Sequence, residues 1–142
     1  MKRQIGAGLL ILMAAGAGCS GGTVSPTIGT ISAAGLAGTW QLELLQSTGQ
    51  GAILKPATAT YTLTLSNGVA SARADCNVCS GPFTLVGDSL SISAGLACTR
   101  ALCPTDEFEA IYTRLLAGES TVGIAGSTMA LVSGRGLLRF TR

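Results

Sequence analysis

The chain has 142 residues, of which 47% are hydrophobic, 4% are aromatic and 20 are glycine, and it contains no histidine. This length predicts one domain behind a short leader, and the glycine content favours short strands joined by tight turns over a helical bundle. The formal net charge of +2 comes from Lys2 and Arg3 at the start, and without a basic stripe or an aromatic ladder nucleic-acid binding has no support.

Residues 1–19 have the pattern of an export signal. Two basic residues are followed by an apolar core from Ile5 to Ala15, which is too short to cross a bilayer as a mature helix. Small residues then lead to Cys19, and this arrangement resembles a lipobox, the signal for lipid attachment to a cysteine. The alternative is an ordinary secretory signal cleaved nearby. Acyl chains on Cys19 would anchor the protein without a transmembrane helix.

The segment 20–35 is rich in Ser, Gly, Thr and Ala and has Pro26 near its middle. It has little to bury, so we expect a flexible tether that holds the folded domain off the membrane. The domain itself is expected to span residues 36–142.

The first part of the domain predicts a series of β-hairpins. Trp40, Leu42 and Leu44 alternate with polar residues on one strand. Asn67-Gly68, the strongest short hairpin signal, lies between two further alternating segments. Comparable turns recur between apolar segments at three later places: Gly87-Asp88, Gly126 and Ser133–Gly136.

One helix is expected between these strands. Pro104 suits a first helical turn, and Asp106 and Glu107 suit the positive end of the helix dipole. Gly118 is a natural C-terminal stop. An apolar face has the spacing i, i+3, i+4, i+7: Phe108, Ile111, Tyr112 and Leu115. The prediction is therefore an α+β fold, in which a strongly bent antiparallel sheet, a partial barrel of hairpins, packs against one helix.

Four cysteines follow the leader, in the order Cys76, Cys79, Cys98 and Cys103. In an exported chain their even number favours two disulfides. A zinc site and a redox-active Cys-x-x-Cys pair are the alternatives. Four cysteines allow three connectivities. We favour Cys76–Cys103 with Cys79–Cys98 nested inside, because two facing antiparallel segments would bring those pairs into register.

The segment around these cysteines resembles the core of META domains, which occur in heat-inducible envelope lipoproteins of bacteria. The resemblance rests on Asp75-Cys76-Asn77, on Gly81 and on Thr99, which precedes a cysteine and an acidic helix. It covers about residues 36–141, and Cys79 and Cys98 are additions to the commoner pattern. It implies an α+β fold, an envelope location and a role in stress tolerance, but no reaction. From its own chemistry, Asn77 is expected to shape the bend after the strand in a left-handed conformation.

The functional expectation is a non-enzymatic module. Without histidine, Ser-His and Cys-His nucleophile systems are excluded, and no catalytic residue, metal site or cofactor is expected. The expected partners are the membrane, through Cys19, and an envelope protein or component, at the outer membrane facing the periplasm. One alternative is an apolar-ligand carrier of lipocalin type, for which the chain is expected to be too short to form eight full strands. The other is an inhibitor of an envelope protease.

Overall fold

The hairpin pattern of the sequence produces a barrel. The structure is a computed structural model that describes residues 30–142. The proposed signal, the lipidation residue Cys19 and most of the proposed tether lie outside the described residues. In chain order the elements are α1 Ala33–Leu36, β1 Gly38–Ser47, β2 Ile53–Leu54, β3 Tyr61–Ser66, β4 Val69–Ala74, β5 Asn77–Val86, β6 Ser89–Ile92, β7 Ala97–Cys98, α2 Asp106–Leu116, β8 Gly118–Ala125, β9 Thr128–Ser133 and β10 Gly136–Thr141.

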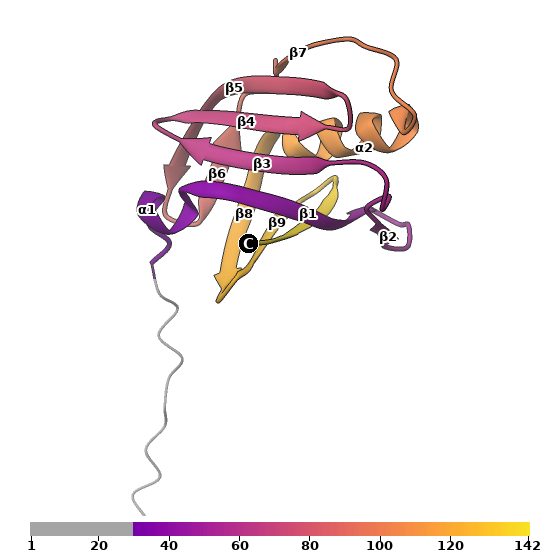
Figure 1. The fold of residues 1–142 in the computed structure, drawn as a ribbon. Coiled ribbons are helices and arrows are strands. Elements are labelled where there is room, and N and C mark those ends of the chain that lie inside the picture. Colours follow the sequence, from indigo (N-terminus) through magenta and orange to yellow (C-terminus); the bar gives the residue numbers. More distant parts are fainter. Residues whose placement is uncertain (1–29) are drawn as a thin grey trace, which may run out of the picture.

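Eight of the strands form a closed antiparallel ring (Figure 1). Neighbours pair in the order β1, β3, β4, β5, β6, β8, β9 and β10, and β10 pairs back onto β1. The prediction of a bent sheet with a packed helix is confirmed, and the expectation that the chain is too short for eight strands is wrong. Eight strands fit within this chain because several ring strands are short, down to four residues in β6, and because the hairpin turns contain only two residues.

A bulge in β1 divides this strand into two parts that pair with different neighbours. The pairing with β10 shifts register between Leu42 and Leu44. Beyond this point the alternation breaks, and Leu44 and Leu45 are both buried. An extra residue in one strand bends it, so β1 pairs with β3 before the bulge and with the short strand β2 after it.

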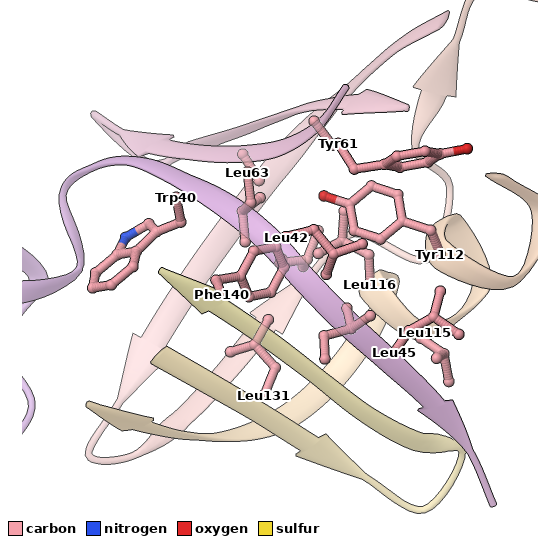
Figure 2. Close-up of a cluster of buried hydrophobic side chains, with 14 of the residues drawn as sticks. Trp40, Leu42, Leu45, Tyr61, Leu63, Tyr112, Leu115, Leu116, Leu131 and Phe140 are labelled. Atoms are coloured by element: carbon pink, nitrogen blue, oxygen red, sulfur yellow. The ribbon is translucent and has the colours of Figure 1, made fainter. Parts of the chain in front are cut away.

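The interior of the barrel is filled by large side chains (Figure 2). Trp40, Tyr61, Tyr112 and Phe140 are completely buried. Tyr112 enters from α2, and its ring meets Tyr61 and Phe140 edge-on at centroid distances of 5.3 and 6.4 Å. Its hydroxyl donates to the Thr62 carbonyl at 2.9 Å, so its one polar atom is satisfied inside an apolar core.

Helix α2 packs against the barrel through the predicted apolar face. Phe108, Tyr112 and Leu115 are buried, Ile111 is partly buried, and Leu116 extends the buried face. The helix begins at Asp106, so Pro104 precedes the helix instead of occupying its first turn.

The folded domain begins slightly before the expected boundary. Ser32 accepts a hydrogen bond from the Gly35 N–H at 3.1 Å and starts the single helical turn α1. Leu36 at its end is completely buried. Within the described part of the chain, no helix combines the length and apolar character needed to cross a membrane.

Candidate functional site

The residues of the predicted motif gather at the end of the barrel that α2 covers. Here the turn between β4 and β5 meets the segment that leads from β7 to α2. Two disulfides join these regions, Cys76–Cys103 and Cys79–Cys98. This is the nested pairing favoured above.

The inner disulfide follows from the strand register. Cys79 lies directly opposite Cys98 in the pairing of β5 with β7, and their Cα atoms are 4.0 Å apart. The adjacent pair, Val78 and Thr99, is hydrogen-bonded, because the Thr99 N–H donates to the Val78 carbonyl at 3.0 Å. Cys79 and Cys98 therefore form a non-hydrogen-bonded pair, in which opposite side chains are closest.

Asn77 is almost completely buried, with 2% exposure, and its amide connects three segments. Its Oδ1 accepts from the Thr99 hydroxyl at 2.9 Å and from the Ala101 N–H at 2.8 Å. Its Nδ2 donates toward the Ala101 carbonyl at 2.9 Å and toward both oxygens of Glu109 at 3.0 and 3.1 Å, and it also lies 3.1 Å from the Cys103 Sγ. The expectation that Asn77 adopts a left-handed conformation is wrong, because the residue with positive φ is Asp75 (φ 56°).

Asp75 caps helix α2 from a distant turn. One carboxylate oxygen accepts from the Thr105 N–H at 3.1 Å and from its hydroxyl at 2.6 Å. Thr105 precedes the helix and makes no capping bond of its own. The Asp75 carboxylate thus meets an unpaired N–H at the positive end of the helix dipole.

Tyr61 completes this arrangement from inside the barrel. Its hydroxyl lies 2.7 Å from the Thr105 hydroxyl and donates to the Thr105 carbonyl at 3.2 Å. Burial raises the pKa of Tyr61 above its ordinary value, against the opposing effect of the Thr105 hydrogen bond. The sequence did not identify Tyr61, Thr105 or the exact partner of Asn77. Of the three acidic residues in the first turn of α2, Glu109 is the one that accepts from the Asn77 amide.

Gly81 has a packing role. A Cβ at this position would lie 3.0 Å from Leu96 Cδ2 and 3.2 Å from Ser93 Cβ. Its missing side chain lets the segment after β6 lie directly over β5. This approach sets the start of β7, and with it the position of Cys98 opposite Cys79.

A surface trough lies beside this cluster, between the segment 94–102 and helix α2. Two adjoining cavities of about 450 and 430 Å³ share Leu96, Cys98 and Thr113 in their walls. Leu102 lies at one end and is 91% exposed. Among residues 30–142, no group of His, Cys, Asp or Glu side chains is placed to hold a metal ion. Asn77 and Glu109 of the polar cluster also line the trough.

The fold and the site together define a class: a small, closed β-barrel with one helix over its end and nested disulfides holding the connection. The family model described as the META domain matches residues 34–142. The chain belongs to the META domain family, as the resemblance of its cysteine segment indicated.

Two solved structures share this fold. One is the NMR structure of a protein from Burkholderia xenovorans, with 27% identity, a TM-score of 0.63, and coverage of 78% of this chain and 85% of that one. The other is an NMR structure of a protein with 18% identity, a TM-score of 0.60, and coverage of 78% of this chain and 94% of that one. A search of curated proteins finds no match.

Proposed function

We propose that this protein is a non-enzymatic lipoprotein of the bacterial cell envelope that binds a protein partner and acts in stress tolerance. The lipobox-like segment ending at Cys19 supports the location. The observation that carries the binding role is that the α2 end combines internally bonded motif side chains with an open surface trough. The motif side chains Asp75, Asn77 and Thr99 bond to one another's segments, while the trough beside them is open and has an exposed leucine.

The role of a non-enzymatic module is supported by the state of the carboxylates at this end. Asp75 accepts from Thr105, and Glu109 accepts from Asn77 with both oxygens. A general acid or base needs a position from which it reaches a substrate proton. These two groups are committed to the helix and to the buried amide, which suits a structural task.

The carrier alternative is compatible with the closed barrel but less well supported by its interior. A lipocalin-type barrel holds its ligand inside the ring. Here Trp40, Tyr61, Tyr112 and Phe140 occupy that space and are completely buried. Saturable quenching of Trp40 fluorescence by a panel of apolar dyes would favour the carrier, and stoichiometric inhibition of envelope proteases would favour the inhibitor.

The lipid anchor is tested by intact mass and fractionation. Protein purified from its native envelope and denatured without reductant is expected to carry acyl chains on Cys19 and to lack four thiol hydrogens, since two disulfides are present. Cys19→Ser is expected to leave the membrane fraction. Retention of this variant in membranes would contradict the anchor.

Partner binding is tested by photo-cross-linking in living cells. A photoreactive amino acid is placed at three exposed positions in separate variants: Ala110 in the trough, Leu54 on β2 and Ala125 at the opposite end. A discrete protein adduct at any of them supports the function. Absence of adducts at all three, with the variants present at the normal level in the envelope, would overturn it.

A further inference from the structure

The trough beside β7 has the geometry of a site for strand addition. Strand β7, Ala97–Cys98, pairs with β5 on one side. Because Cys98 and Cys79 form the non-hydrogen-bonded pair, the N–H and C=O groups of Cys98 point away from β5. Within residues 30–142, no hydrogen bond found outside the β-ladders involves the N–H or the C=O of Cys98. Cys98 lines both cavities of the trough, so we infer that this free edge borders the trough.

A free strand edge is a template for another chain. An extended peptide in the trough would accept from the Cys98 N–H and donate to its carbonyl, as in other proteins that bind peptides by adding a strand. The two disulfides and the Asn77 amide hold this edge in place before binding. An edge ordered in advance lowers the entropy cost of association.

The charges at the two ends of the trough differ. At the end near Leu102, two acidic residues, Asp106 and Glu109, and one basic residue, Arg100, line the trough. At the other end, Arg114 and Arg135 line the wall. A peptide with a basic residue toward the first end and an acidic residue toward the second would match this polarity, and such a match also sets its direction.

We propose that the trough between β7 and α2 binds an extended segment of an envelope protein as an added β-strand, with a basic and an acidic side chain at opposite ends. An apolar side chain of the peptide contacts Leu102 and Leu96. A segment of about five or six residues, a common strand length, matches this arrangement. This inference rests on the proposed function and assigns its partner-binding surface.

The test uses a phage-displayed library of random dodecapeptides and the acylated, disulfide-bonded protein purified in detergent from its native envelope. Selected peptides are expected to be enriched in alternating apolar residues with a basic and an acidic residue at opposite ends. In the bound state the backbone amide of Cys98 gains an acceptor. Its hydrogen is therefore expected to exchange at a rate at least about tenfold lower than in the free protein. Selected peptides that leave this amide unprotected, or a library that yields no binder, would overturn the proposal.

Matched variants separate the trough from the rest of the surface. Ala110 is an exposed residue of α2 that lines the trough, and Ala110→Arg is expected to weaken binding of a selected peptide about tenfold or more by filling it. Ala125→Arg, the same change at the opposite end of the barrel, is expected to leave the affinity unchanged. Arg114→Glu is expected to abolish the preference for an acidic residue in a fresh selection. Equal binding by the Ala110 and Ala125 variants would overturn the proposal.

The outcomes also distinguish this inference from the proposed function. A cross-linked partner at Leu54 or Ala125, with none at Ala110, would leave the protein a binding module and remove the trough as its site. A dimer in sedimentation that Ala110→Arg dissociates would assign the edge to a second copy of the chain and overturn the foreign-peptide assignment.

Discussion

The two ends of the barrel are closed by different kinds of interaction. At the end where the described chain enters, Trp40 packs under α1, its Nε1 donates to the Leu36 carbonyl at 2.9 Å, and the Arg142 guanidinium lies 4.2 Å from the ring centroid. At the α2 end, two disulfides and the buried Asn77 hold the connection. In Figure 2 Trp40 lies on the opposite side of the core from Tyr61 and Tyr112.

The difference reflects what each closing segment has to bury. The entry segment supplies Leu36 and Trp40, both completely buried, and closes its end by apolar burial. The segment 97–102 is exposed or half-exposed throughout, and its one large apolar residue beyond β7, Leu102, faces solvent. Such a segment gains little from the hydrophobic effect, so covalent and polar links hold it instead.

Trp40→Ala is expected to give the largest effect and to break the apolar end. Removing a completely buried indole is expected to cost about 3–5 kcal/mol of unfolding free energy. Chemical denaturation followed by circular dichroism measures it. Arg142→Ala, which removes the cation over the ring and a hydrogen bond of 3.4 Å to the Ala37 carbonyl, is expected to cost about 0.5–1 kcal/mol. Similar costs for the two variants would contradict a closure based on burial.

Removing the outer disulfide is the corresponding test of the α2 end. Cys76→Ser with Cys103→Ser opens a link between residues separated by 27 positions and is expected to cost about 2–4 kcal/mol. Calorimetry of the double variant measures the loss. Unchanged stability of the double variant would contradict the structural role of this disulfide. The Cys79→Ser, Cys98→Ser pair provides the matched comparison within the same end.

Asn77→Asp tests the polar contribution with almost no change of shape. The new carboxylate would face both oxygens of Glu109, and the N–H donor that these oxygens share would be lost. We expect this change to lower the free energy of unfolding by about 1–3 kcal/mol. Adding Glu109→Gln restores a donor and is expected to recover part of the loss. A double-mutant cycle on denaturation free energies measures the coupling, and strict additivity would mean that the two residues do not interact.

High pH is expected to weaken the domain through its tyrosines. Burial raises the pKa of Tyr112 far above its ordinary value of 10.0, and the unfolded chain has no such shift. The folded state keeps a proton that the unfolded state releases, so this stability is present below pH 10.0 and declines above it. The decline is expected to approach about 1.4 kcal/mol per pH unit per buried tyrosine.

Denaturation series above and below this pH measure the decline, with phenolate absorbance as the signal of exposure. Tyr112→Phe is expected to reduce the slope. It also removes the hydrogen bond to the Thr62 carbonyl, so the slope and not the absolute stability is the quantity to compare. A phenolate signal from both tyrosines in the folded protein near pH 10 would contradict their burial.

The sequence predicts what local chemistry determines. The Asn67-Gly68 turn has positive φ at both residues, 49° and 74°, and such a turn is recognisable from two residues alone. Helix α2 is also recognisable from sequence, because the spacing of its apolar residues lies within one segment. The α+β class and the hairpins follow from such local signals.

Interactions between distant residues were harder to predict. Closure of the ring depends on the pairing of β1 with β10, and the bulge after Leu42 is a shift in the register of that pairing. Asp75 takes the left-handed conformation expected of Asn77, and its carboxylate caps a helix 30 positions later. The spacing of residues in the sequence does not predict these contacts, because the residues come close together only in the complete fold.

The pairing of β1 with β10 has a kinetic consequence. Gln41 lies opposite Thr141, so the ring has a seam between the first and last strands of the domain. A chain still emerging from a ribosome lacks the second side of this seam, and contacts so distant in sequence make folding slow. We expect the domain to stay open until its final residues are available, which would keep the chain unfolded for the export proposed above. Truncation by a single strand at the C-terminus would leave a permanently open sheet with two free edges.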